Sequence, residues 1–392
     1  MVSILDALKA FVRVSFTGCV VLSASAQSPL RLEDAPGINQ LFGVQTLGSS
    51  LKCSFEQKKP TLDYSLRFHA GYIVDCPPAE FGGKETPLMI YARITPEGKA
   101  PILLGEVYHL PALPPDTMAR ADRNSFFEMS GGFRVGEGSY LVEILVVDDR
   151  HRIFQRHWRI TAARHGRRPA AQLLIQANTV EPLFGFPKLE PSRVANQQEF
   201  RLTLILDAAP IDPFKAKLRA WERASLLNAL WALIVETHCH SVRVVVFNFV
   251  QQREIFRQDR FDRTALTRLA QVLGDLEMAT VSVESLRHQR LPDELLASLV
   301  NQEFKNGDPP DALVFLGPTT RFANRVRPEL LEMGNHTATK VFNFELYSGQ
   351  GSYPADTMVY LTRALNGVTY RIYTPDDFRK AIQQMIETLK RH

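Results

Sequence analysis

The spacing of hydrophobic residues changes near the middle of this 392-residue chain. In the first half, apolar residues alternate with polar ones, as between Leu62 and Val74, which is the period of a strand with one buried face. In the second half, apolar residues form short uninterrupted runs, and the first run, residues 201–207 (RLTLILD), ends in a carboxylate. Such runs are typical of parallel strands that are covered by helices on both faces. The change of period predicts two domains with different architectures.

The alternating half predicts an antiparallel β-sandwich over residues 51–163. One long strand is predicted over residues 62–74, with a bend or bulge near Gly71. Shorter strands are predicted from the same alternation at residues 88–94, 102–108, 140–146 and 153–160. The glycine turn at 136–138, the strand YLVEILVVDD and the final strand with Trp158 resemble immunoglobulin-like (Ig-like) and fibronectin-like modules. A proline-rich linker is predicted over residues 164–199.

The second half, residues 200–392, predicts an α/β fold with a doubly wound, Rossmann-type sheet. Strands are predicted at 201–207, 241–249, 312–316, 340–347 and 368–373, with a polar edge strand at 253–258. Helices are predicted at 213–236, 262–276, 292–305, 355–365 and 375–392, with one more between residues 316 and 340. The last helix has the clearest start, because Thr374 is a good N-cap and Pro375 suits the first helical position.

The N-terminus predicts export. Two basic residues precede an apolar stretch at 14–22, and residues 24–26 (ASA) form a small-residue cleavage site. We expect a signal peptide at residues 1–26, cleaved after Ala26, and a periplasmic or extracellular location. Lipidation at Cys19 is an open alternative. Residues 27–50 mix Pro, Gly, Ser and Asp without a period and predict a mobile leader.

Composition narrows the range of partners. The chain is 45% hydrophobic and 22% charged, and a formal net charge of +4 gives no reason to expect a nucleic-acid partner. After residue 26, no apolar stretch approaches the roughly 20 residues of a membrane-spanning helix. We therefore expect no membrane span and a partner that is another protein, while the oligomeric state stays open.

Three cysteines follow the predicted signal peptide, namely Cys53, Cys76 and Cys239, and export permits a disulfide. Cys53 and Cys76 lie in one predicted domain. If residues 57–61 form a hairpin turn, Cys76 lies about 36 Å along a straight strand from the position opposite Cys53. Only a chain reversal near Gly71 would bring the two together. The strand geometry thus disfavours this bridge without excluding it.

The order of elements in the second half, with a hairpin edge strand after the second strand and Asp207 at the end of the first, resembles the von Willebrand factor A (VWA) domain. With the export signal and the β-sandwich, the chain is similar to a family of exported acidobacterial proteins described as related to that domain. VWA domains with a metal site place D-x-S-x-S after the first strand and an aspartate after the fourth. Here Asp207 matches the first position, Ala209 and Ile211 replace both serines, and residues 317–320 (GPTT) carry no aspartate. The resemblance therefore implies a degenerate metal site, and no bound metal is expected.

The candidate binding site is the carboxyl edge of this sheet, because open α/β sheets place their sites there. The candidate binding residues are Asp207, Asp212, Thr319, Thr320 and Arg321. Three arginines of the same region, Arg321, Arg325 and Arg327, offer charge to an anionic ligand or partner.

Two further clusters are interpreted as structural. His238, Cys239 and His240 are adjacent, so their side chains diverge and do not predict a metal site. Residues 215, 219 and 223 are basic and share one helical face, which predicts a solvated surface. The chain has no G-x-S-x-G, H-E-x-x-H, G-x-G-x-x-G or Walker sequence, so no catalytic residue and no cofactor is assigned.

Two functional hypotheses follow. The first is an exported, non-catalytic protein-binding module with a metal-independent VWA-like domain. The second is a hydrolase-type enzyme in which Asp207 forms an acid–base pair with Asp212 or a nearby histidine. An open Asp207 beside a second titratable group would favour the enzyme, whereas a site filled by the carbon atoms of Ala209, Ile211 and Pro318 would favour the binding module.

Overall fold

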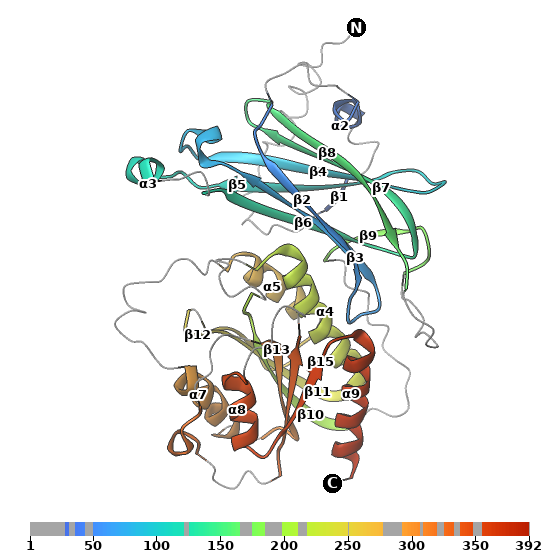
Figure 1. Cartoon of the computed structure of the whole chain (residues 1–392). Coiled ribbons are helices and arrows are strands. Elements are labelled where there is room, and N and C mark those ends of the chain that lie inside the picture. The colour runs from blue at the N-terminus through green and yellow to red at the C-terminus, as the bar shows by residue number, and fades with distance from the viewer. Residues whose placement is uncertain are drawn as a thin grey trace. The chain divides into compact units, whose positions relative to one another are not determined.

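The computed structural model describes residues 28–30, 36–43, 50–120, 125–164, 175–184, 198–210, 218–249, 251–276, 292–305, 309–319, 325–332, 338–347 and 355–391. The chain divides into two compact units (Figure 1). The first unit comprises Met1–Leu62 and Leu66–Gly185, and the second comprises Asp63–Ser65 and Phe186–His392. The predicted signal peptide and its cleavage site lie outside the described residues.

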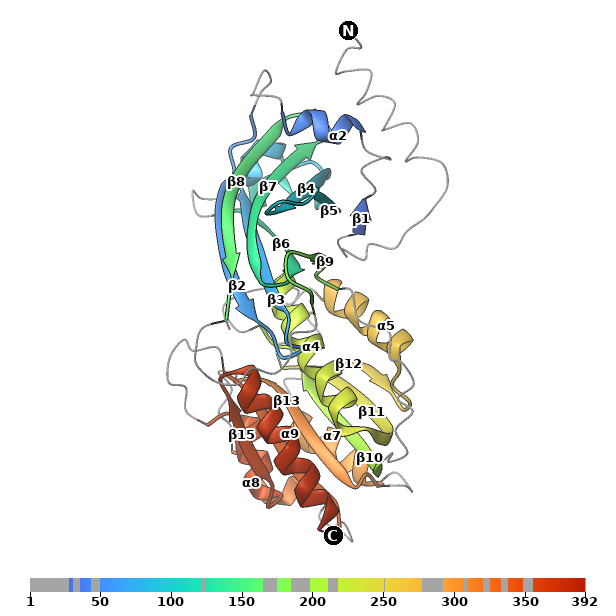
Figure 2. The ribbon, with the colours of Figure 1, turned by 90° about the vertical axis from the view of Figure 1, so that its right-hand side faces the viewer.

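The first unit contains two antiparallel sheets that share one hydrophobic core (Figure 2). The five-stranded sheet has the order β1 (Ser28–Leu30), β5 (Ile102–Leu110), β4 (Thr86–Pro96), β7 (Gly138–Asp148), β8 (Ile153–Ala162). The four-stranded sheet has the order β2 (Ser54–Leu62), β3 (Phe68–Cys76), β6 (Phe127–Val135), β9 (Val180–Pro182). Three short helical segments accompany the sheets, namely α2 (Pro36–Leu41), η2 (Pro78–Phe81) and α3 (Pro115–Arg120). Both sheets bury alternate residues, such as Tyr72 and Phe133 from one and Ile90 and Val142 from the other.

The segment 27–50 was predicted to be a mobile leader, but its described residues, 28–30, 36–43 and 50, include a strand and a helix. Strand β1 pairs with β5, and helix α2 lies in the same segment. Ile38 and Phe42 are buried in a second cluster with Tyr91 and Leu145. Helix α2 has less than two turns, which is too short for a 3.6-residue period to show in the sequence.

The disulfide between Cys53 and Cys76 is formed, and the predicted hairpin turn was wrong. Strands β2 and β3 pair antiparallel with Ser54 opposite Asp75, so the chain reverses after Leu62 and not at residues 57–61. The sequence around Pro60 resembles a turn, but the chain continues there as strand β2. The only irregularity is a shift in the pairing register between Lys58 and Thr61. The single strand predicted over residues 62–74 is therefore the end of one strand, a turn and most of the next.

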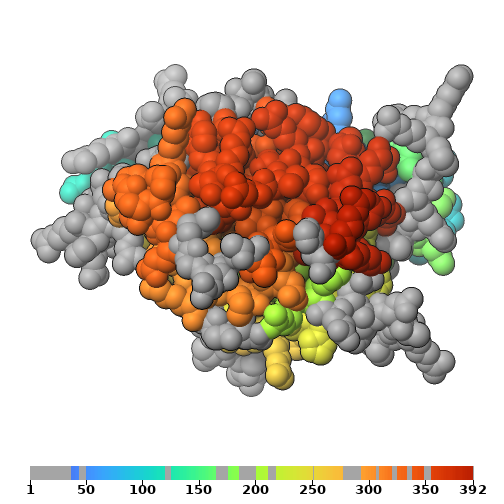
Figure 3. All heavy atoms as spheres, turned by 90° about the horizontal axis from the view of Figure 1, so that it is seen from below, coloured from blue at the N-terminus to red at the C-terminus, as the bar shows by residue number. Residues whose placement is uncertain are grey.

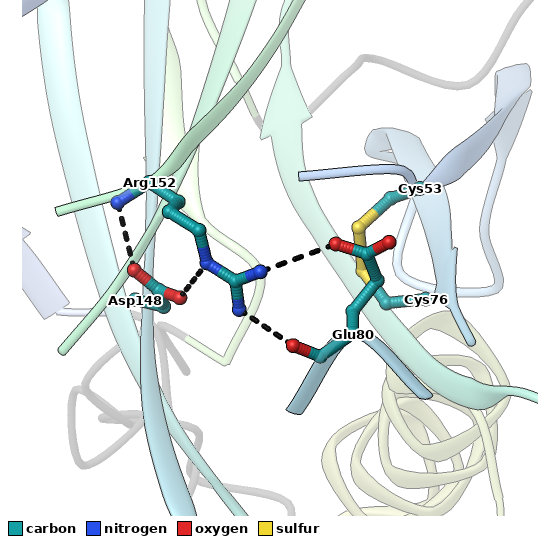
Figure 4. The surroundings of a disulfide bond; sticks show 5 residues. All are labelled: Cys53, Cys76, Glu80, Asp148 and Arg152. Atoms are coloured by element: carbon teal, nitrogen blue, oxygen red, sulfur yellow. Dashed lines mark hydrogen bonds and ion pairs between the residues drawn. A yellow bond between two sulfur atoms is a disulfide. The ribbon is translucent and has the colours of Figure 1, made fainter. Parts of the chain in front are cut away.

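An ion-pair network lies beside the disulfide (Figure 4). The Arg152 guanidinium donates to Asp148 Oδ2 at 2.7 Å, to Glu80 Oε2 at 3.2 Å and to the Glu80 carbonyl at 2.8 Å. Asp148 is fully buried, so these charge-assisted bonds satisfy a carboxylate that would otherwise be costly to bury. They connect the end of β7 to the segment after β3.

Strand β6 was not predicted, because Gly131 and Gly132 interrupt its alternation. A Cβ on Gly132 would lie 2.8 Å from the Ala70 carbonyl oxygen on the neighbouring strand. The glycine that hides the strand in the sequence is thus needed for close backbone approach inside the sheet.

The second unit is built on a six-stranded mixed sheet. Its order is β12 (Arg253–Gln258), β11 (Cys239–Asn248), β10 (Gln198–Asp207), β13 (Ala312–Pro318), β14 (Lys340–Leu346), β15 (Val368–Ile372). All neighbouring pairs are parallel except β11 with β12. The central strands are apolar because helices cover both faces.

Helices α4 (Ala220–Thr237), α5 (Arg263–Gly274) and α9 (Pro375–Lys390) cover one face, and α7 (Pro292–Lys305) and α8 (Thr357–Ala364) cover the other. Residues coloured orange to red, from α7 onward, occupy much of the surface of this unit that Figure 3 shows. Helix α9 begins as predicted, with Thr374 accepting from the Asp377 backbone N–H. Between β13 and β14, the described residues contain only the short helix η3 (Pro328–Leu330) where a longer helix was predicted. No helix in the described part of the chain is long and apolar enough to cross a membrane.

Residues Asp63–Ser65 belong to this second unit. The Asn228 side chain on α4 donates to Asp63 Oδ2 at 2.8 Å, and the Tyr64 ring lies 5.0 Å from the ring of Phe378 on α9. All four of these side chains are at least half-buried, so the short segment is packed in the unit.

Glu303 on α7 is a buried carboxylate with several partners on the sheet. Its side chain is fully buried and accepts from Arg243 at 2.8 Å, from Arg257, and from the Thr203 hydroxyl at 3.3 Å. Three neighbouring strands, β10, β11 and β12, thus hold one carboxylate, which ties α7 to the sheet.

Candidate functional site

The carboxyl ends of the parallel strands bring together residues that are far apart in the sequence. Asp207 ends β10, Gly317 lies near the end of β13 and Glu345 lies near the end of β14. The register pairs Leu206 with Leu316 and Gly317 with Glu345. Asp207, Gly317 and Glu345 therefore form one row across the sheet. Their side-chain positions are on the face covered by α7 and α8, because Ile205 and Phe315 two residues earlier contact those helices.

Asp207 is completely buried, which the sequence did not predict for a binding residue. Neither carboxyl oxygen has a hydrogen-bond partner among the described residues. Burial raises the pKa of Asp207 well above its ordinary value, and the nearby Asp356 carboxylate raises it further. Both effects disfavour the ionised form of Asp207 and favour the protonated form.

Asp356 has a structural task beside Asp207. It is the N-cap of helix α8, where its Oδ1 accepts from the Val359 backbone N–H at 3.0 Å. A negative charge on Asp356 is favourable at this helix end, and the same charge disfavours ionisation of Asp207.

Gly317 leaves room for Asp207. A Cβ built on Gly317 would lie 2.8 Å from the Asp207 Cβ, closer than carbon atoms approach in proteins. A glycine is therefore required at this position for steric reasons. In the sequence, the same residue was noted only because the GPTT segment lacks the aspartate of a metal site.

Asn248, which sequence reasoning missed, fixes the chain just beyond Asp207. Its side chain donates to the Ala208 carbonyl at 2.6 Å and accepts from the Gln251 backbone N–H at 2.9 Å. Ala208 in turn donates its backbone N–H to the Phe247 carbonyl at 2.9 Å. A buried asparagine at the end of an apolar strand was the signal that could have identified this position.

Glu345 is the second buried carboxylate of the row. The Thr319 hydroxyl donates to Glu345 Oε1 at 2.9 Å, and Arg371 on β15 lies 3.4 Å from Oε2. Thr319, one of the predicted binding residues, is thus engaged with Glu345 and not with Asp207. Asn343 lies two residues before Glu345, on the same face of β14. It is buried, and neither amide atom has a hydrogen-bond partner among the described residues.

The described residues do not fit the magnesium ion that a VWA fold implies. Mg²⁺ needs several oxygen ligands at about 2.1 Å. The side chains of Ala209 and Pro318 carry no oxygen, and the Thr319 hydroxyl is hydrogen-bonded to Glu345. No group of three or more His, Cys, Asp or Glu side chains in the described ranges has metal-binding geometry. The raised pKa of Asp207 also opposes the loss of the proton that a bound cation would have to displace.

The other predicted residues are placed as follows. Asp212, Thr320 and Arg321, together with Ile211 and Lys215, lie outside the described residues. Arg327 forms ion pairs with Asp293 and Glu294 on α7, at 3.0 Å and 2.5 Å, and the Arg325 guanidinium lies 5.8 Å from the Tyr360 ring centroid.

The basic helical face predicted at residues 215, 219 and 223 is corrected by the structure. Arg219 precedes the first turn of α4, where its backbone N–H donates to Glu222, and Arg223 is buried. Arg223 reaches the next helix, since its guanidinium lies 2.7 Å from the position of a Cβ on Gly274. The helical period alone cannot tell a solvated basic face from one that a neighbouring helix covers.

A small cavity lies at the same edge on the opposite face of the sheet. Its volume is about 40 Å³, enough for about three water molecules. It is lined by Tyr64, Ala209, Glu222, Ser225, Leu226, Pro318, Leu346 and Tyr347, all from the second unit. Burial is the main cause that raises the pKa of Tyr64 to about 12, so its phenol is neutral and available as a hydrogen-bond donor.

Comparisons with known proteins add little to this geometry. No protein-family model and no curated protein matches the chain. Among solved structures, the ArnB paralog VWA2 from Sulfolobus acidocaldarius matches with 10% identity and a TM-score of 0.26, over 65% of this chain and 50% of that one. This chain therefore spans half the length of that neighbour.

Two further solved structures are similar at the same low level. The putative ApaA protein from Bordetella pertussis has 13% identity and a TM-score of 0.20, over 30% of this chain and 98% of that one. A putative beta-galactosidase from Bacteroides fragilis has 10% identity and a TM-score of 0.21, over 87% and 45%. TM-scores this low do not indicate a function. The fold of the second unit is defined by its own strand order.

Proposed function

We propose that this protein is an exported, non-catalytic binding protein whose C-terminal unit is a VWA-like domain that recognises another protein without a metal ion. In this proposal the N-terminal unit is an Ig-like sandwich, and the chain is related to the exported acidobacterial VWA-like proteins that its sequence resembles. The support is the strand order with a single antiparallel edge strand, β12, and an aspartate at the end of β10.

The burial of Asp207 carries the proposal. A carboxyl group with no exposed surface and with both oxygens unpaired in the described residues is out of reach of a substrate. Its raised pKa disfavours the charged form through which a metal would be held. At the place where a metal-binding domain holds its ion, this chain has the buried carboxyl group of Asp207. Gly317 leaves space for this group, and Asn248 holds the backbone next to it.

A hydrolase-type enzyme is the second candidate, and one observation favours it. Asp207 and Asp356 are two interacting carboxyl groups, and burial together with the Asp356 charge raises the pKa of Asp207, a pattern that also occurs in acid–base pairs. An enzyme of this kind would need Asp207 to be reached by substrate, possible only if the packing around it opens. We rank it below the binding protein because Asp356 is already committed to the start of α8.

The deciding experiment uses the secreted full-length chain as bait for proteins of its own periplasm or culture medium. We expect the same specific partner in millimolar Mg²⁺ and in EDTA, and equal recovery by the Asp207→Asn variant. The melting temperature of the chain alone is expected to be equal in Mg²⁺ and EDTA, since a bound ligand would raise it.

Two results would oppose the proposal. A metal-dependent rise in melting temperature that Asp207→Asn abolishes would restore the metal site. Hydrolysis of a panel of ester, amide or glycoside substrates by the wild type, lost in Asp207→Asn at unchanged melting temperature, would establish the enzyme.

A further inference from the structure

The first unit contains an unusually basic stretch. Residues 150–180 include seven arginines and three histidines and no Asp or Glu, although the whole chain has a net charge of only +4. The described part of this stretch includes β8, an edge strand of the five-stranded sheet. The excess of positive charge is therefore local, and it coincides with a sheet edge.

The basic residues of this stretch differ in what they contact. Arg152 is engaged by Asp148 and Glu80, and Arg164 lies 3.2 Å from Glu137. By contrast, three residues on β8 are exposed and have no carboxylate partner among the described residues: His157 and Arg159 on one face of this edge strand, and Arg156 on the other.

Strand β2 continues the same edge. It is an edge strand of the four-stranded sheet, it contacts β8, and the Phe55 and Trp158 rings of the two strands lie 4.8 Å apart. Figure 2 shows β2 and β8 on the same side of the first unit. Lys52 and Lys59 are exposed there, also without a carboxylate partner in the described residues. We call the surface formed by Lys52, Lys59, Arg156, His157 and Arg159 the basic edge.

We propose that the basic edge binds an acidic, extended segment of a partner protein. Guanidinium groups pair with carboxylates through two parallel hydrogen bonds, which gives direction as well as attraction. His157 and Arg159 are two residues apart on one strand face, about 6.6 Å, which is also the spacing of alternate side chains in an extended acidic peptide. This surface does not depend on the function proposed for the C-terminal unit.

The surface fits a polypeptide better than a nucleic acid. Proteins that bind single strands stack bases on exposed aromatic rings. The exposed large hydrophobic side chains of the described residues are Val107, Phe126, Val368 and Tyr373, and none lies on β2 or β8. Phe55 and Trp158 face one another and pack on the core. An acidic peptide requires only the charged groups that the basic edge offers.

Fluorescence anisotropy with a labelled peptide of alternating glutamate and threonine tests the proposal on the full chain. We expect saturable binding that weakens with added salt and that the double variant R156Q/R159Q reduces on the order of tenfold. The control variant R363Q/R391Q removes the same charge from exposed positions of the second unit and should leave binding unchanged.

Three results would overturn it. These are equal binding by R156Q/R159Q at an unchanged melting temperature, equal binding of a glutamine–threonine peptide, and equal loss in both double variants. Tighter binding of oligodeoxythymidylate than of the peptide, lost in R156Q/R159Q alone, would reassign the basic edge to nucleic acid.

Discussion

Replacing Asp207 by asparagine removes one titrating group and leaves shape and packing nearly unchanged. The carboxyl group is completely buried beside the Asp356 carboxylate, and both causes raise its pKa well above the ordinary value of 3.8. In the unfolded chain the same group titrates near its ordinary pKa of about 3.9. Between these two pKa values, the folded state therefore binds one proton more than the unfolded state.

The sign of the pH dependence follows from this difference. The contribution of Asp207 to the free energy of unfolding is fully present below about pH 4, where the group is protonated in both states. This contribution falls as the pH rises towards the folded pKa. Between the unfolded and the folded pKa, this contribution to the free energy of unfolding should fall by about 1.4 kcal/mol per pH unit. Asparagine is neutral at every pH, so the Asp207→Asn variant lacks this slope.

Urea unfolding at a series of pH values from 4 to 8, followed by tryptophan fluorescence, measures the effect. Two of the three tryptophans, Trp221 and Trp231, lie on α4 of the second unit. Other carboxylates contribute equally to both proteins and cancel in the difference. We expect the variant to gain stability over the wild type steadily as the pH rises.

The control is Glu329→Gln, which removes an exposed carboxyl group of the same unit and should show no such gain. Parallel stability curves for wild type and Asp207→Asn would refute the reasoning, because they would mean that Asp207 is ionised in the folded state.

Three further substitutions test the packing. Gly317→Ala should lower the free energy of unfolding by about 1–3 kcal/mol, because the new Cβ would overlap Asp207. A lower melting temperature would show this effect, and an unchanged one would show that the strands separate easily. Glu303→Gln should cost about 3–5 kcal/mol in urea unfolding, because it leaves two arginine side chains without their shared carboxylate, and a loss no larger than that of the exposed Glu332→Gln would contradict this. Cys53→Ser should cost about 3 kcal/mol, the value for a loop closed over 23 residues, and the oxidised wild type should match it on reduction.

The sequence determined the α/β half of the fold well because the relevant signals are local. Uninterrupted apolar runs identified β10, β11, β13 and β14, and the polar run at residues 253–258 identified the edge strand β12. The start of α9 was readable from Thr374 and Pro375, since capping depends on a few consecutive residues. The aspartate at the end of β10 was correctly placed at the carboxyl edge of the sheet.

The first half was harder to predict because its strands depend on their partners. The turn between β2 and β3 falls inside a continuous alternating pattern, so only the pairing of Ser54 with Asp75 shows that Cys53 and Cys76 meet. Strand β6 contains two glycines that weaken its pattern, and one of them, Gly132, is needed for close approach of the neighbouring strand.

The state of Asp207 was decided by tertiary structure alone. The sequence shows a carboxylate after an apolar strand, which is compatible with a metal ligand, a general base or a buried acid. The choice depends on groups brought from residues 248, 317 and 356, and above all on the exclusion of water, which no local pattern encodes. Because the free energy of a charge is set by everything within several ångströms of it, a sequence can name the group while only the fold assigns its proton.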